Sequence, residues 1–300
     1  MVAGTVVILG LPNVGKSTLL NQIVGQKLAI VSSKPQTTRN RILGVWNGPA
    51  GQIVFVDTPG VHAARNALGR FMLDEALGAV EGVDAALLVV TPPESAQAVK
   101  VTTEERRILE LLRETKRPTV LAINKVDTVK DKPALFPVLT AWNEIANFAA
   151  LVPVSARRGT GVPSLIGELA KVLPEGEPLY SPDMLTDRTE RFLAGELIRE
   201  QLFAALKQEL PYATAVLVEN WEERADRNDV VIDASIMVER DSQKSIVVGK
   251  AGAMIKEIGS RARHEITELL GRPAHLRLHV KVAPEWTSSQ GAIANLGYDR

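Results

Sequence analysis

Gly10-Leu-Pro-Asn-Val-Gly15-Lys16-Ser17 is the stretch that decides the fold of this 300-residue chain. It matches the pattern GxxxxGK[ST] and lies between a short apolar run, Thr5–Leu9, and a helical pattern, Thr18–Val24. In such a loop the glycines let successive backbone amides turn inward toward a phosphate group. The lysine reaches the outer phosphate oxygens, and the serine hydroxyl is placed to bind Mg²⁺. We therefore predict a nucleotide phosphate site here rather than an ordinary glycine turn.

Apolar runs alternate with amphipathic stretches from this loop to about residue 173. The runs are short and rich in branched residues, which is typical of buried parallel strands. The predicted strands are Thr5–Leu9, Ile53–Val56, Ala85–Val90, Val120–Ile123 and Leu151–Val154. Helical spacing of apolar residues marks Glu104–Arg113 and Ser164–Leu173. The alternation predicts a doubly wound α/β fold, in which helices flank a mostly parallel sheet.

A Pro, Gly and acidic stretch, Pro174–Pro178, interrupts this pattern and indicates a linker. We predict a nucleotide-binding domain over residues 1–175, a linker over 176–186 and a second, α+β domain over 187–300. Asp187 with Glu190 resembles a capping box that opens a long helix. The later predicted elements are the strands Ala213–Glu219, Val230–Val238 and Ile246–Val248, the helix Met254–Leu270, and the strand Leu276–Val282, whose alternation predicts one solvent-exposed face.

Composition sets outer limits on function. Hydrophobic residues make up 45% of the chain and charged residues 23%, which is typical of a globular protein. The absence of cysteine excludes disulfides and thiolate metal sites, and it fits a reducing cytosol. The start of the chain has no basic, cleavable leader, and no run approaches 18 uncharged apolar residues, so we expect neither export nor a membrane span. A net charge of zero argues against a protein that coats nucleic acid with its whole surface.

Asn124-Lys125-Val126-Asp127 follows a predicted strand and indicates GTP rather than ATP. A carboxylate at Asp127 can accept hydrogen bonds from two donors of guanine that adenine lacks. An unpaired buried carboxylate would reject adenine strongly, which disfavours an ATPase. We expect Lys125 to lie across the base, and the backbone after Ser155-Ala156 to contact the guanine carbonyl.

Asp57-Thr58-Pro59-Gly60 ends another predicted strand and predicts a segment that responds to hydrolysis. The aspartate can hold Mg²⁺ through its water shell, and the Gly60 amide can contact the γ-phosphate. A second such segment is expected at Ser32–Arg41, where Thr37 or Thr38 would donate a hydroxyl to Mg²⁺. We favour Thr38.

These motifs together resemble the Era-like branch of the translation-factor-related GTPases. Gln36-Thr37-Thr38-Arg39, Leu210-Pro211-Tyr212, Val248–Gly252 and Leu296-Gly297-Tyr298 extend the resemblance over essentially the whole chain. It implies a GTPase domain followed by a type II KH domain, which binds the 3′ end of small-subunit ribosomal RNA during 30S assembly.

Val61 stands where Ras-like enzymes have a water-orienting glutamine, so we expect slow turnover. In GTPases of this branch, an asparagine at the place of Asn13 helps to seat K⁺. Asn13 is therefore the candidate K⁺ ligand, and the alternative is that it only shapes the loop.

Read without the resemblance, Gly249-Lys250-Ala251-Gly252 is a GxxG loop, predicted to lie between a strand and a helix. Such loops clamp the backbone of single-stranded nucleic acid. From Arg240 to Lys281 there are nine basic and four acidic residues, so a basic face is local here.

For His275 and His279 we favour solvent or RNA contact over metal binding, and for Trp286 packing over base stacking.

The sequence therefore predicts a GTPase switch with the following site residues. The catalytic group is Lys16, Thr38, Gly60 and Asn13. The nucleotide ligands are Gly10, Leu11, Pro12, Asn13, Val14, Gly15, Lys16, Ser17, Thr18, Asp57, Thr58, Pro59, Gly60, Val61, Asn124, Lys125, Val126, Asp127, Ser155 and Ala156. The Mg²⁺ ligands are Ser17, Thr38 and Asp57, and the RNA contacts are Gly249, Lys250, Ala251, Gly252, Lys244 and Lys256.

The expected ligands are GTP or GDP, Mg²⁺ and, as a further option, K⁺. The expected partners are small-subunit ribosomal RNA and the assembling 30S subunit. We expect a monomer in the cytoplasm, with peripheral contact to the inner membrane left open. The alternative function is a membrane- or protein-docking G protein whose C-terminal domain binds a protein.

Overall fold

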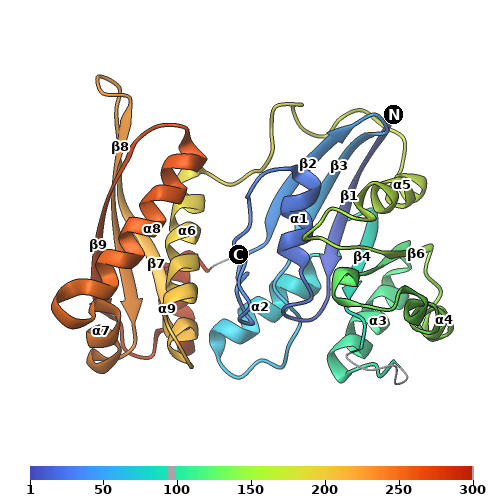
Figure 1. Cartoon of the computed structure of the whole chain (residues 1–300), viewed down its shortest axis with the longest axis horizontal. Helices are drawn as coiled ribbons and strands as arrows, with labels where there is room; N and C mark the ends of the chain where they lie inside the picture. Colours follow the sequence, from blue (N-terminus) through green and yellow to red (C-terminus); the bar gives the residue numbers. More distant parts are fainter. Residues whose placement is uncertain (94–98, 299–300) are drawn as a thin grey trace. The chain divides into compact units, whose positions relative to one another are not determined.

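The computed structural model describes residues 1–93 and 99–298, which form two compact units (Figure 1). Among the described residues, the first unit comprises 1–29, 38–63, 72–93 and 99–187, and the second comprises 30–37, 64–71 and 188–298. Two short segments that the sequence places within the first domain thus belong to the second compact unit.

The first unit is built on a six-stranded sheet with the spatial order β2-β3-β1-β4-β5-β6. Its strands are β1 (Val2–Leu9), β2 (Ile42–Gly48), β3 (Gly51–Asp57), β4 (Ala85–Val90), β5 (Thr119–Ile123) and β6 (Ala150–Pro153). All neighbouring strands are parallel except β2 and β3. The five predicted strands and the mostly parallel sheet are confirmed.

Strand β2 is an edge strand that the sequence pattern does not reveal. It contains Gly44, which usually weakens a strand. A Cβ atom at this position would lie 2.6 Å from the Cδ1 atom of Leu20 on the adjacent helix, so a larger residue would force that buried side chain to shift. The close approach of that helix explains why a residue with no strand preference lies in the strand.

Helices cover both faces of this sheet. Helices α1 (Lys16–Val24) and α5 (Val162–Val172) share one apolar cluster with alternate strand residues. Helices α2 (Ala67–Gly78), α3 (Thr103–Thr115) and α4 (Leu135–Ile145) contribute to the cluster on the opposite face. Short 3₁₀ turns occur at Val126–Thr128 and Lys132–Ala134. The predicted motifs lie in the loops that follow the C-terminal ends of β1, β3 and β5.

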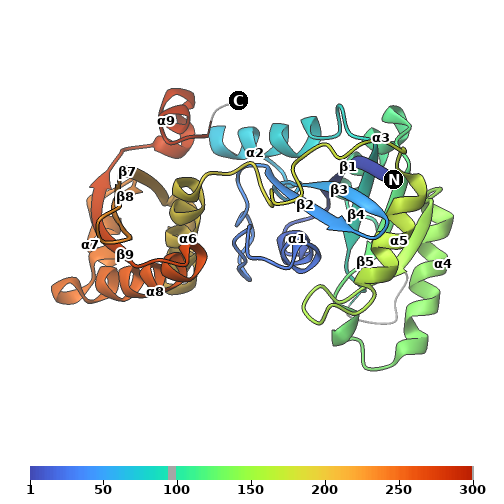
Figure 2. The same ribbon diagram turned by 90° about the horizontal axis from the view of Figure 1, so that it is seen from above.

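The second unit has a three-stranded mixed sheet of β7 (Ala215–Arg224), β8 (Asp229–Val238) and β9 (Ala274–Val282), with helices on one face (Figure 2). β7 and β8 are antiparallel, whereas β8 and β9 are parallel. The helices are α6 (Glu190–Ala205), α7 (Asp241–Val248), α8 (Ala253–Leu270) and α9 (Gln290–Asn295), with 3₁₀ turns at Leu210–Ala213, Lys250–Gly252 and Trp286–Ser288.

Two predictions about the secondary structure of this unit are wrong: one concerns the type of an element and the other concerns the start of a helix. Ile246–Val248 is not a strand but the last turn of α7. Its three branched apolar residues suggest a strand, yet the Gln243 Oε1 atom accepts hydrogen bonds from the backbone amides of Glu239 and Arg240, at 2.8 and 3.2 Å, and so starts a helix. The cap of α6 is Thr189, which accepts from the Phe192 amide, and not Asp187.

The outer face of the three-stranded sheet is polar, as the alternation in the last strand predicts. Cross-strand ion pairs join Lys281 to Glu219 at 2.5 Å and Arg277 to Asp233 at 2.7 Å. The opposite face packs against α6 and α8. Within residues 1–93 and 99–298, no helix is long and apolar enough to cross a lipid bilayer.

Candidate nucleotide-binding site and KH loop

The phosphate loop joins β1 to α1 and depends on its glycines. Gly10 and Gly15 have φ angles of 150° and 96°. A Cβ atom at Gly10 would lie 2.4 Å from the carbonyl oxygen of Val89, and one at Gly15 would lie 2.4 Å from Nδ2 of Asn124. The loop therefore requires glycine at both positions, and it ends at the N-terminus of α1, where anions bind favourably.

Lys16 is buried at the first position of α1. Its Nζ atom donates to the carbonyl oxygens of Gly10 and Leu11, at 3.1 and 3.0 Å. Burial lowers the pKa of Lys16 to about 8, although the carboxylate of Asp57 opposes this shift. The amine thus lies inside the loop, where a negatively charged phosphate would favour its charged form.

Three oxygen-bearing side chains that lie far apart in the sequence meet beside Lys16. The Ser17 hydroxyl donates to Oδ2 of Asp57 at 2.6 Å and lies 2.8 Å from the hydroxyl of Thr38. Burial raises the pKa of Asp57 to about 6, with Lys16 and Ser17 opposing the shift.

The buried Oδ1 atom of Asp57 has no hydrogen-bond partner among residues 1–93 and 99–298. A hard cation with oxygen ligands would satisfy this atom and would remove the cost of burying the carboxylate. The donor set thus fits Mg²⁺.

The two candidate threonines have different surroundings. The Thr38 hydroxyl lies at the cluster of Ser17 and Asp57, whereas the Thr37 hydroxyl donates to the carbonyl oxygen of Lys34 at 2.8 Å. The preference for Thr38 as the Mg²⁺ ligand stays a prediction, and this geometry favours it.

The segment after β3 packs closely on the phosphate loop. A Cβ atom at Gly60 would lie 2.6 Å from the backbone nitrogen of Pro12. The Thr58 hydroxyl donates to the carbonyl of Ile8 at 2.7 Å, and the Val61 amide donates to the carbonyl of Gly10 at 3.1 Å. The Val61 side chain is buried in the apolar cluster under α2 and α3. It therefore contributes packing and no polar group.

Asn124 connects the predicted guanine loop to the phosphate loop. Its Nδ2 atom donates to the carbonyl of Val14 at 2.8 Å, and its Oδ1 atom accepts from the Ala156 amide at 2.9 Å. Lys125, with a φ of 63°, donates from Nζ to the carbonyl of Asn13 at 2.5 Å. Asn124 thus holds loops from three parts of the chain together, which the motif alone does not reveal.

Asp127 is half-buried, and a side chain of a neighbouring loop holds its carboxylate. The Ser155 hydroxyl donates to its Oδ1 atom at 2.7 Å. This hydrogen bond is the main reason why the pKa of Asp127 is lowered. The motif predicts a contact only from the backbone after Ser155-Ala156, and it gives no sign that the Ser155 side chain orients Asp127.

The GxxG loop in the second unit lies between helices α7 and α8, not between a strand and a helix as predicted. Gly249 and Gly252 have φ angles of 74° and 78°, and Ala251 has a φ of 49°. A Cβ atom at Gly249 would lie 2.6 Å from Cβ of Met254, whereas one at Gly252 would meet nothing within 4 Å. Lys250 and, on the flanking helices, Lys244 and Lys256 are exposed.

The histidines and Trp286 have other partners in the second unit. His275 on β9 lies 3.0 Å from Oδ2 of Asp229, and His264 on α8 lies 3.4 Å from Glu268. Trp286 is fully buried and donates from Nε1 to the carbonyl of Ala213 at 2.9 Å. The prediction that Trp286 is a packing anchor is confirmed.

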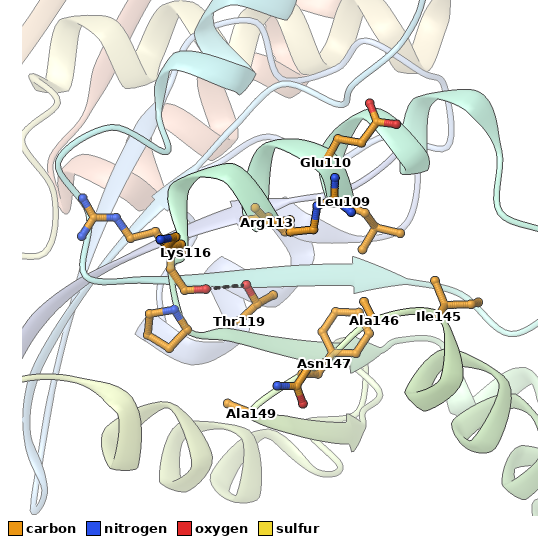
Figure 3. A pocket seen from close by; sticks show the side chains of 13 residues that line it. Leu109, Glu110, Arg113, Lys116, Thr119, Ile145, Ala146, Asn147 and Ala149 are labelled. Atoms are coloured by element: carbon orange, nitrogen blue, oxygen red, sulfur yellow. Dashed lines mark hydrogen bonds between the residues drawn. The ribbon is translucent and has the colours of Figure 1, made fainter.

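A cavity of about 620 Å³ lies elsewhere in the first unit (Figure 3). It opens between the C-terminal end of α3 and the segment before β6, and Lys116, Thr119, Ile145 and Asn147 are among its lining residues. Thr119 is the first residue of β5, so the cavity is at the N-terminal end of that strand. Ligands of open α/β sheets bind at the carboxyl ends. This cavity therefore lies at the opposite end of the strand from the loops that are predicted to bind the nucleotide.

Two protein families match the chain by their sequence profiles. The family described as 50S ribosome-binding GTPase matches residues 5–125, and the KH domain family matches residues 209–287. The two matches agree with the two architectures seen in the structure.

GTPase Era of Geobacter metallireducens is 47% identical over 296 residues, which cover 99% of this chain and 97% of that relative. GTPase Era of Xanthomonas axonopodis pv. citri is 46% identical, with coverage of 99% and 97%.

Solved structures of Era superimpose over the full length of the chain. A variant of Aquifex aeolicus Era bound to GDP·AlF₄⁻ gives a TM-score of 0.95 at 36% identity, and all of both chains is covered. Era in complex with MgGDPNP and nucleotides 1506–1542 of 16S ribosomal RNA gives a TM-score of 0.94 at 36% identity, again with full coverage. With relatives this similar along its whole length, the chain belongs to the Era family of GTPases.

Proposed function

We propose that this GTPase is a switch that binds the 3′ end of small-subunit ribosomal RNA and acts in assembly of the 30S subunit. The observation that carries the proposal is the meeting of Ser17, Thr38 and Asp57 beside Lys16, in a chain that also presents an exposed GxxG loop. The full-length similarity to Era bound to MgGDPNP and 16S ribosomal RNA supports it.

In the proposed GTP state, Ser17, Thr38 and Asp57 hold Mg²⁺ and Lys16 contacts the β- and γ-phosphates. The metal supplies positive charge where negative charge develops on the phosphate oxygens. Thr38 and Gly60 lie on the two segments that would change position when the γ-phosphate is lost. Asp127, oriented by Ser155, selects guanine.

We propose slow turnover, because the buried Val61 side chain offers no atom to orient water. Positive charge from a K⁺ ion beside Asn13 would compensate in part. The φ of 62° at Asn13 is tolerated better by asparagine than by most residues, so a purely conformational role is the competing interpretation.

The proposed division of labour assigns nucleotide chemistry to residues 1–175, a linker to 176–186 and RNA binding to 187–300. In the RNA-binding part, Gly249–Gly252 clamps the RNA backbone, and Lys244, Lys250 and Lys256 add positive charge. A monomer in the cytoplasm is the proposed state, and peripheral membrane contact is a further proposal that cell fractionation tests.

Nucleotide-dependent RNA binding tests the proposal directly. The full chain is titrated with a short RNA of the ribosomal 3′-end sequence and with a scrambled RNA, each with GDP and with the GTP analogue GDPNP plus Mg²⁺. We expect selective binding that is tighter with GDPNP and collapses in Gly252→Asp. A new Cβ at Gly252 meets nothing within 4 Å, but a side chain is strained at the φ of 78° there, so thermal unfolding of Gly252→Asp checks that the loss does not come from a folding defect. Equal affinity for both RNAs, or for both nucleotide states, contradicts the proposal.

A further inference from the structure

The cavity of about 620 Å³ is lined only by residues of the first unit, which come from two stretches of chain. One stretch, residues 109–119, is the C-terminal half of α3 with the turn into β5, and the other, residues 145–149, runs from the end of α4 to β6. Arg113 and Lys116 lie on the α3 side, and Ala146 and Asn147 lie on the other (Figure 3). The volume is within the range of about 300–1,000 Å³ that is typical of small-molecule sites.

Apolar side chains line part of this cavity. Leu112 and Phe148 are buried, and the Phe148 ring packs edge-on against Trp142 of α4, with 6.4 Å between the ring centroids. Ile145, at the end of α4, is 38% exposed and is one of the few large apolar side chains that the described residues leave open to solvent. Because covering exposed apolar surface is favourable, this part of the lining favours a ligand with an apolar body.

Positively charged side chains line another part. Arg113, Lys116 and Arg117 are exposed, whereas Glu110 is the single acidic residue of the lining. Among residues 1–93 and 99–298, no carboxylate forms an ion pair with any of these three cations. An anionic group in the cavity would therefore supply the charged hydrogen-bond acceptor that the described protein groups do not supply.

The end of α3 does not need these cations as hydrogen-bond donors for its last turn. The Thr115 hydroxyl already donates to the carbonyl oxygens of Leu111 and Leu112, at 2.9 and 3.3 Å. The Thr119 hydroxyl donates to the carbonyl oxygen of Arg117 at 3.1 Å (Figure 3). The two threonines thus hold the turn after α3 in place, and they leave the basic side chains available to a ligand.

We propose that this cavity is a binding site for a small organic anion, whose apolar body packs against Ile145 and Phe148 and whose carboxylate or phosphate group faces the three cations. The exposed side chain of Asn147 makes no hydrogen bond to any other residue that the structure describes, so it can donate to the ligand or accept from it. The inference does not depend on the proposed function, because the cavity is at the N-terminal end of β5 and the predicted nucleotide loops follow the C-terminal ends of strands.

Four probes separate the two halves of the proposed site. Naphthyl phosphate and naphthoate combine an apolar body with a phosphate or a carboxylate, whereas naphthol lacks the charge and inorganic phosphate lacks the apolar body. Each probe is titrated into the full chain in the presence of saturating GDP and Mg²⁺, so that the nucleotide site is occupied. Calorimetry measures the affinity, and NMR shifts of the backbone amides of residues 109–119 and 145–149 report binding at the cavity.

One pair of variants tests the charged part of the lining. Arg113→Gln with Lys116→Gln removes two cations of the cavity. The control, Arg106→Gln with Arg107→Gln, makes the same charge change at exposed positions of α3 outside the lining. We expect the affinity for at least one of the two naphthyl anions to fall about 10-fold or more in the cavity variant, because charged hydrogen bonds are lost, and to match the parent chain in the control.

A second pair tests the apolar part. Ile145→Ser should weaken binding of the same anion about 4-fold or more, which corresponds to about one methylene group that is no longer covered. Phe136→Ser, at a residue of α4 that is 69% exposed and outside the lining, is the control and should bind as the parent does. Thermal unfolding checks that each variant is folded.

Three results would overturn the inference. The first is the absence of amide shifts at the cavity with both naphthyl anions. The second is binding of naphthol or inorganic phosphate that is as tight as that of the naphthyl anions, since the site is proposed to need both parts of the ligand. The third is an affinity that stays at the parent value in the folded cavity variants.

Discussion

The Ser155 hydroxyl donates a hydrogen bond of 2.7 Å to the carboxylate of Asp127, across 28 residues of sequence. One residue belongs to the loop after β6 and the other to the loop after β5, so the bond joins two carboxyl ends of neighbouring parallel strands. It leaves the second carboxylate oxygen available to a ligand and keeps the group ionised, as its lowered pKa indicates. A fixed, charged acceptor is what discrimination by hydrogen bonding requires.

Asp127→Ala should abolish the preference for guanine. Two donors of the base would lose a charged acceptor, at about 1.5–3 kcal/mol for such a bond. We expect GDP affinity to fall about 100-fold or more relative to the parent chain, with little change for ADP. Competition of both nucleotides against a fluorescent analogue measures the ratio. Ser155→Ala, which removes the orienting bond only, should give a smaller loss, and retained guanine preference in Asp127→Ala would refute the assignment.

Asn13 offers a clean test of K⁺ dependence. We expect turnover of the parent chain to be faster in KCl than in NaCl, and Asn13→Gly to lose that difference. Glycine tolerates the φ of 62° at this position, so the loop shape survives while the side-chain oxygen is removed. Phosphate release is measured in both salts at equal ionic strength. If Asn13→Gly retains the K⁺ effect, Asn13 only shapes the loop.

Val61→Gln should not convert the chain into a fast GTPase. The side chain at this position is buried among apolar residues, so an amide there would lose hydrogen bonds to water, at about 1–3 kcal/mol. We expect a lower unfolding temperature and no faster hydrolysis in single-turnover assays. A rise in the single-turnover rate would mean that the segment can turn this side chain toward the phosphates.

Most strands of the first unit could be predicted because β1, β3, β4 and β5 are continuous apolar runs that are almost wholly buried. Edge strand β2 could not be predicted, since its Gly44 leaves room for the side chain of Leu20, and Leu20 lies on another element. The error at Ile246–Val248 has a similar origin. Local composition suggests a strand there, and the side chain of Gln243 starts a helix instead.

In the candidate site, too, some features follow from the local sequence and others depend on distant residues. Contiguous motifs place Lys16, Ser17 and Asp127 at loops after strands, so their approximate positions follow from the sequence. The contacts that orient them do not, because Asn124 reaches Val14 across 110 residues and Ser155 reaches Asp127 across 28. Such long-range pairs leave no periodic trace in one sequence.

Arg224→Gln should raise the pKa of Asp229 toward its usual value. A hydrogen bond from Arg224, at 2.7 Å, is the main cause of the lowered pKa, and His275 adds to it. A carboxylate with a lowered native pKa stabilises the fold above its unfolded pKa of about 3.9, and this stabilisation is lost as pH falls through the native pKa.

The stability difference between parent and variant should therefore be full at pH 7 and shrink below about pH 4. Urea unfolding at several pH values measures it, and NMR titration of the carboxyl carbon reports the pKa. Arg227→Gln, at an exposed residue 3.6 Å from Asp226, is the control that should leave the Asp229 pKa unchanged. A pKa that stays low in Arg224→Gln would assign the shift to His275.

Gly60→Ala should separate the response to GTP from nucleotide binding as such. The new Cβ would lie 2.6 and 2.7 Å from backbone atoms of Pro12, and backbone cannot yield as a flexible side chain can. Overpacking of this kind costs about 1–3 kcal/mol. Because Gly60 is expected to approach the γ-phosphate and no other phosphate, GDPNP affinity and hydrolysis should fall about 10-fold or more, while GDP affinity stays near that of the parent.

Gly167→Ala, where a Cβ meets nothing within 4 Å inside α5, should change neither affinity and should stabilise the helix by about 0.5–1 kcal/mol. Equal losses for GDP and GDPNP in Gly60→Ala would instead indicate a general distortion of the phosphate loop.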